Sequence, residues 1–171
     1  MSDCISQLIN LKSTIMQNNE KLVQALNELV SINYDRVFGY EKASEEVGGN
    51  DIDLRTLFNR NASQSRKYVS DLQQTIRGLG GEPVTDSTTR GKLFRVWMDF
   101  KSTLMGKDRK SVLDSCAYGE EAALKAYDEA LQTEAHLPDN IRVSIAEHKQ
   151  TLTSAHRAIQ EAARLQEVVD K

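Results

Sequence analysis

One acidic residue in this chain occupies a position where a helix would be expected to be apolar. In residues 111–134, apolar residues recur at steps of three and four, which is the spacing of one helix face. These residues are Leu113, Cys116, Ala123, Tyr127 and Ala130. Glu120 falls on the same face. Because burying an unpaired carboxylate costs several kcal/mol, we expect Glu120 to be ion-paired, hydrogen-bonded or metal-bound.

Two kinds of partner would satisfy Glu120. The first is a polar layer across a helical bundle, which fixes the register of the helices at some cost in stability. Its predicted members are Asn33, Arg36, Tyr40, Tyr68, Glu120 and His156. The second is a metal site, because carboxylates and imidazoles together bind iron, manganese or zinc. Its predicted ligands are Glu120 and His156, with Glu41 or Asp35 as a further carboxylate.

The remaining reactive side chains form no catalytic pair in the sequence. His148 lies eight residues before His156, about 12 Å along a helix, which is too far to complete the same site. The two cysteines, Cys4 and Cys116, both fall within helical patterns and have no neighbouring histidine. A Cys/His nucleophile is therefore not indicated.

Composition narrows the class of protein. The net charge is −3, so no basic patch suggests nucleic-acid binding. The first residues lack the basic and apolar regions of a signal peptide, and no stretch of 18 apolar residues suggests membrane insertion. The chain has only two cysteines, so we do not expect a secreted domain held together by disulfides. We expect a cytoplasmic location instead.

Long helices must position these residues. The chain has 171 residues and only two prolines, which favours a single all-α domain. Its first helix should begin near Ser2 and carry two heptad rows. The rows are Leu8, Ile15, Leu22 and Leu29, and Cys4, Leu11, Asn18, Ala25 and Ile32. They suit either coiled-coil packing, with Asn18 as a register-setting polar residue, or the ordinary apolar stripe of a bundle helix.

The length of this first helix predicts an oligomer. A helix that is unbroken to residue 47 would be roughly 65 Å long, more than the other helices can cover. Either it breaks near residues 17–19, or its N-terminal third packs on another subunit. We expect a homo-oligomer, with a dimer favoured, formed through the N-terminal heptads.

Four further segments complete the pattern of elements. Glycines at 48 and 49 end the first helix, and a second helix follows over residues 54–79. Residues 78–91 are rich in turn formers and make a long connection. A short amphipathic helix is predicted over 93–104, and the last helix should run from Pro138 to about Val169.

Two short motifs make the assignment more specific. The turn Leu79-Gly80-Gly81-Glu82-Pro83 and the run Gly119-Glu120-Glu121-Ala122-Ala123 resemble an uncharacterised bacterial family of ferritin-like four-helix-bundle proteins, over about residues 20–165. The resemblance implies an all-α, up-down bundle with a long middle connection, an extra short helix before the third bundle helix and an extended N-terminal helix. Residues 1–19 would be the extension and 20–169 the bundle. The resemblance also implies a role in stress physiology.

The resemblance does not bring a full iron site with it. A ferritin-like di-iron centre takes one Glu from each of two helices and a Glu-x-x-His from each of the other two. Glu120 and His156 stand at two of these positions, but Thr153 replaces the glutamate expected before His156. On the second helix, residues 64–68 include neither a glutamate nor a histidine. On the first helix, the cationic Arg36 is expected at the same height along the bundle as the carboxylates of Asp35 and Glu41. We therefore expect a non-catalytic bundle that acts by self-association or protein binding, with no cofactor. The alternative is a metalloprotein that binds a single transition metal.

Overall fold

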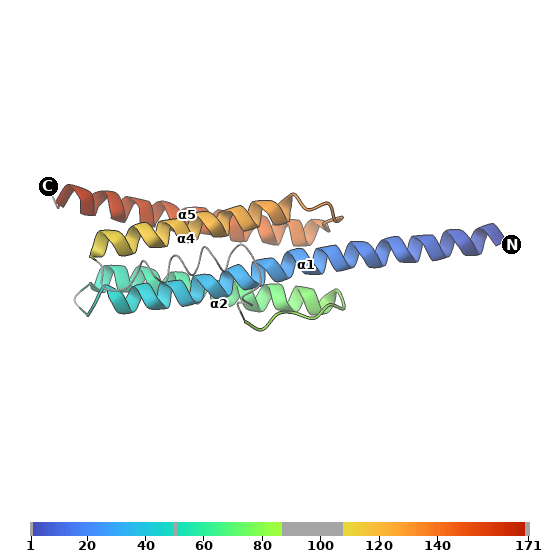
Figure 1. Ribbon diagram of the computed structural model, residues 1–171, viewed down its shortest axis with the longest axis horizontal. Coiled ribbons are helices and arrows are strands. Elements are labelled where there is room, and N and C mark those ends of the chain that lie inside the picture. The colour runs from blue at the N-terminus through green and yellow to red at the C-terminus, as the bar shows by residue number, and fades with distance from the viewer. Residues whose placement is uncertain (1, 50, 87–107, 170–171) are drawn as a thin grey trace.

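The computed structural model describes residues 2–49, 51–86 and 108–169, and it is a bundle of long helices (Figure 1). Its elements are α1 (Ser2–Glu46), α2 (Ile52–Gly78), α4 (Arg109–Leu131) and α5 (Asp139–Val169). The part of the chain described contains no strand. The predicted all-α four-helix bundle is confirmed. The predicted short helix over 93–104 lies outside the described residues.

The helices form two antiparallel pairs. α1 packs along α2, α4 packs along α5, and α1 joins the pairs through its contact with α4 (Figure 1). α2 and α4 run in the same direction, so the connection between them joins opposite ends of the bundle (Figure 1). One long crossover of this kind is typical of ferritin-like bundles. None of the described helices is long and apolar enough to cross a membrane.

α1 is one unbroken helix of 45 residues, so the break considered near residues 17–19 does not occur. Its N-terminal part extends beyond the ends of the other helices (Figure 1). Asn18 joins α1 to the rest of the bundle by two hydrogen bonds. Its Oδ1 accepts from the backbone N of His136 at 2.5 Å, and its Nδ2 donates to the carbonyl of His136 at 3.3 Å. Asn18 is therefore bound to the α4–α5 loop of its own chain. The division of the chain at residue 19 stays a prediction.

The glycine turn after α2 is explained by local geometry. Gly80 has φ +77°, which only glycine adopts without strain and which ends the helix. A Cβ on Gly81 would stand 2.6 Å from Cγ2 of Val23, so a side chain there would clash with α1. Asn27 of α1 then holds the turn, donating to the carbonyl of Glu82 at 3.0 Å and accepting from the N of Val84 at 2.8 Å.

The apolar core is divided into two clusters. One is built around Leu26, Ile76 and Tyr127, and the other around Phe58 and Leu113. Polar side chains, buried as completely as the core residues, lie between the two clusters along the bundle. This polar level holds the candidate site.

Candidate functional site

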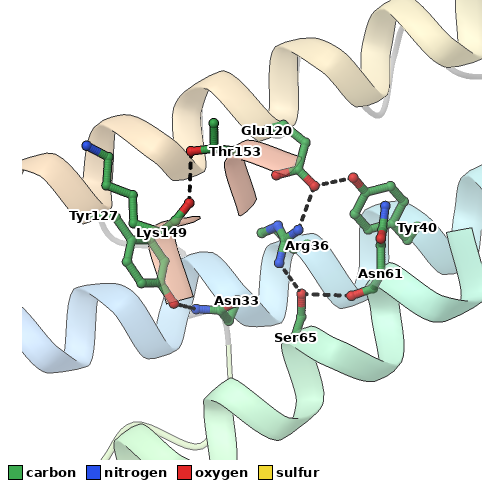
Figure 2. Close-up of polar contacts among 9 residues, drawn as sticks. All are labelled: Asn33, Arg36, Tyr40, Asn61, Ser65, Glu120, Tyr127, Lys149 and Thr153. Carbon is green, nitrogen blue, oxygen red and sulfur yellow. Dashed lines mark hydrogen bonds and ion pairs between the residues drawn. The ribbon is translucent and has the colours of Figure 1, made fainter. Parts of the chain in front are cut away.

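Glu120 is paired with a buried arginine. The Nη2 of Arg36 lies 2.6 Å from Oε1 of Glu120, and the two side chains are 3% and 1% exposed (Figure 2). Arg36 comes from α1 and Glu120 from α4, so the ion pair joins the two helical pairs. Each residue reaches this point because it occupies a core-facing position on its own helix. Glu120 was expected to be ion-paired, hydrogen-bonded or metal-bound, and in the structure it is ion-paired with Arg36.

Two hydroxyl groups complete the first contacts of this ion pair. The hydroxyl of Tyr40 donates to the same Glu120 Oε1. Arg36 Nη1 donates to Oγ of Ser65 at 2.5 Å, and Ser65 donates in turn to the backbone carbonyl of Asn61 at 3.1 Å. α1, α2 and α4 thus contribute to one hydrogen-bonded centre (Figure 2).

The electrostatics of the site favour a charged Arg36 and a protonated Tyr40. Burial lowers the pKa of Arg36, but the carboxylate of Glu120 outweighs that effect and holds the pKa above its ordinary value. Burial, with Glu120 nearby, raises the pKa of Tyr40 well above its ordinary value. The same two causes raise the pKa of the Cys116 thiol, so it remains a protonated core residue.

Three buried polar atoms at the centre have no hydrogen-bond partner among the described residues: Nε of Arg36, Oε2 of Glu120 and Nδ2 of Asn61. The first two belong to the ion-paired side chains themselves. Buried donors and acceptors of this kind suit hydrogen bonds to ordered water.

A second polar cluster lies one level along the bundle. Nδ2 of Asn33 donates to the hydroxyl of Tyr127 at 2.8 Å, and that hydroxyl lies 3.4 Å from Nδ1 of His148. The ring of Tyr68 stacks on His148 with ring centroids 3.8 Å apart. His148 is 6% exposed and belongs to the core of α5.

The predicted layer is thus distributed over two levels. Arg36, Tyr40 and Glu120 meet, while Asn33 and Tyr68 join Tyr127 and His148 in the second cluster. His156 lies beside Glu121, with Nε2 3.5 Å from its Oε1, whereas Glu120 contacts Arg36 and Tyr40. Sequence reasoning missed Ser65, Asn61 and His148. Each of them lies on the apolar stripe of its helix, and a polar residue at such a position was the signal available in the sequence.

The predicted metal ligands lie in different environments. Glu41 is about half exposed and pairs with Arg66, and Asp35 is partly exposed. Within the described parts of the chain, no group of three or more His, Cys, Asp or Glu side chains gathers. Arg36 already neutralises the charge of Glu120, and a guanidinium would repel a metal dication. These residues do not fit a di-iron centre.

Protonation of His148 is expected to destabilise the fold. Burial lowers its pKa from 6.5 to about 4; Asp71 opposes the shift, and Lys67 adds to it. The unfolded chain therefore binds a proton at a higher pH than the folded chain does. Stability then falls as the pH drops through this window, by about 2 kcal/mol between pH 7 and pH 4.5.

Urea unfolding of the wild type and His148→Phe at those two pH values measures this effect. The variant should lose about 2 kcal/mol less on acidification than the wild type does. An equal loss in both proteins would show that His148 keeps an ordinary pKa in the fold.

Comparison with known proteins agrees with this architecture. The family model described as Domain of unknown function (DUF2383) matches residues 21–133. A crystal structure described as ferritin like, diiron-carboxylate proteins from Bacillus anthracis str. Ames matches with a TM-score of 0.61 and 20% sequence identity. The match covers 86% of this chain and 96% of that chain. No curated protein matched the sequence. The ferritin-like fold expected from the motifs is confirmed.

Proposed function

The chain belongs to the family described as Domain of unknown function (DUF2383), and from this membership and its ferritin-like fold we propose a non-catalytic bundle that works by self-association of its N-terminal helix. The observation that carries the proposal is the apolar surface of α1 beyond the bundle. It consists of Ile5, Ile9, Leu11, Ile15 and Met16, which are 53–63% exposed. We call this surface the N-terminal stripe.

The N-terminal stripe suits a second copy of the chain as its partner. Residues 2–19 contain only two charged residues, Asp3 and Lys12, so two such helices can approach with little repulsion. Within the stripe, Leu11 and Ile15 continue the two heptad rows of α1, whose later members Leu22, Leu29 and Ile32 lie in the core of the bundle. The same spacing supports helix–helix packing between copies.

The energy of burial indicates a dimer of moderate affinity. Fully burying a large apolar side chain is worth about 1.5–3 kcal/mol, so covering a half-exposed one is worth about 1 kcal/mol. Five such residues in each copy contribute about 10 kcal/mol in a dimer. Association costs about 4–15 kcal/mol, so the dimer should form and dissociate with protein concentration.

The polar centre supports the non-catalytic part of the proposal. Glu120, the carboxylate on the bundle axis, is engaged by Arg36 and Tyr40, and all three side chains are buried. A general acid or base must reach its substrate and exchange a proton near neutral pH. A carboxylate that is enclosed and charge-neutralised is poorly suited to either task.

Replacing Ile5, Ile9 and Ile15 by glutamine should convert the dimer into a monomer. The expected result is a halving of the mass, because the variant removes three of the five side chains of the N-terminal stripe. Size-exclusion chromatography with multi-angle light scattering measures it, and circular dichroism checks that the helices remain.

A matched control lies at the other end of the chain. Leu165, Val168 and Val169 of α5 are 54–77% exposed, and their replacement by glutamine should leave the dimer intact. A wild type that is monomeric at all concentrations tested would refute self-association. So would an unchanged mass in the N-terminal variant.

The alternative is a metalloprotein with a reduced site at Glu120 and His156, helped by Glu41 or Asp35. Its support is the description of the similar crystal structure as diiron-carboxylate proteins. Plasma mass spectrometry on the purified protein separates the two functions. Stoichiometric iron, manganese or zinc that is lost in Glu120→Ala would favour the metalloprotein over our proposal. The cytoplasmic location and the stress-related role stay predictions.

A further inference from the structure

The described residues leave a seam between α2 and α5. These two helices touch at few points, in contrast to the other neighbouring pairs. A groove of about 610 Å³ lies between them. This volume falls within the range of about 300–1,000 Å³ that small-molecule sites occupy.

The walls of the groove are positively charged. Arg60 and Lys67 of α2 both line it, and no acidic side chain is among its described lining residues. Both cations are exposed, and neither forms an ion pair with a described residue. They are seven residues apart, about 10 Å along the helix. Two cations at this separation suit a ligand with an anionic group at each end.

The remaining walls offer neutral hydrogen-bonding groups. Gln64 lines the α2 side, and Thr151 and Ser154 line the α5 side. The two α5 hydroxyls donate to backbone carbonyls of their own helix, at 3.1 and 3.2 Å. Their oxygens are therefore left as acceptors, which suit hydroxyl groups on a ligand.

One residue of the groove also belongs to the polar centre. Asn61 lines the groove, but it is only 1% exposed. Figure 2 shows the Asn61 amide pointing from α2 toward the interior of the bundle, so its donor serves the polar centre and not a ligand in the groove.

From these observations we propose that the α2–α5 groove binds a small organic dianion with a hydroxylated body. The anionic ends lie against Arg60 and Lys67, and the hydroxyl groups lie against Thr151 and Ser154. The proposal is independent of self-association, because the N-terminal stripe contributes no residue to the groove.

Isothermal titration calorimetry on the full chain tests the site with fructose bisphosphate as the probe. The bisphosphate should bind more tightly than fructose monophosphate, and free fructose should give no heat. The double variant Arg60→Gln/Lys67→Gln should weaken binding of the bisphosphate by about tenfold or more, because two charge-assisted contacts are lost. Circular dichroism checks that the double variant remains folded.

The double variant Arg55→Gln/Arg77→Gln is the matched control. It removes the same charge from exposed positions of α2 that do not line the groove. It should leave the affinity within about twofold of the wild type. Absence of binding to the wild type would overturn the proposal. An equal weakening in both double variants would do so too, because it would show nonspecific attraction of the anion to the helix.

Discussion

Replacing Glu120 by alanine is expected to lower the free energy of unfolding by about 3–5 kcal/mol, because it leaves a buried guanidinium without its counter-charge. Arg36 is 5% exposed, and it also donates a hydrogen bond to the neutral hydroxyl of Ser65. A water molecule in the place of the lost carboxylate would carry no charge to balance the guanidinium. Urea unfolding followed by circular dichroism measures the change.

A double-mutant cycle separates the ion pair from the rest of the site. Arg36→Met should cost about as much as Glu120→Ala, because it leaves the carboxylate buried and unpaired. The double variant should be more stable than the sum of the two losses predicts, because neither charge then remains. Additive losses would show that the two side chains do not interact as the structure indicates.

A surface pair provides the control for this cycle. Glu161 and Arg164 form an ion pair at 2.7 Å, but both side chains are more than half exposed. Glu161→Ala should change stability little, because water screens and solvates exposed charges. If Glu120→Ala were as mild as Glu161→Ala, the buried ion pair would not be a structural centre.

Phe58→Ala is expected to cost about 3–5 kcal/mol, because it opens a cavity in a close-packed core. Phe58 is fully buried, and its ring packs against Tyr40 with ring centroids 5.8 Å apart. The cavity would therefore also loosen the tyrosine whose hydroxyl holds Glu120. Thermal and urea unfolding measure the loss.

The control for Phe58 lies on the same helix. Ile52 is 71% exposed, so Ile52→Ala removes apolar atoms that already face water and should have little effect. Phe58→Leu should fall between the two, because it keeps most of the apolar contact. A Phe58→Ala protein as stable as Ile52→Ala would show that this end of the core is loosely packed.

The residue types of the polar centre differ from those of a di-iron centre. A ferritin-like frame places side chains from facing helices at the middle of the bundle. Here the same position on the axis is taken by a cation, a carboxylate and two hydroxyls. Function has to be argued from such a site and not from the fold, because one fold carries many activities.

The helices themselves follow from the sequence. Their apolar periodicity and glycine stops are local features, and local features are sufficient to define a helix. Asp108 is an example of such a local feature, because its side chain caps α4 by accepting a 2.9 Å hydrogen bond from the N of Ser111. The need of Glu120 for a partner also follows from the sequence, since burying a bare charge is costly anywhere.

The identity of that partner required the tertiary structure. Arg36 and Glu120 are 84 residues apart, and their contact depends on how far α1 and α4 slide and rotate against each other. That offset places Asn33 one level away, beside Tyr127, and leaves His156 next to Glu121. Periodicity determines which face of a helix is buried. The height at which two buried side chains meet is determined by the packing of whole helices, which no single segment of the sequence encodes.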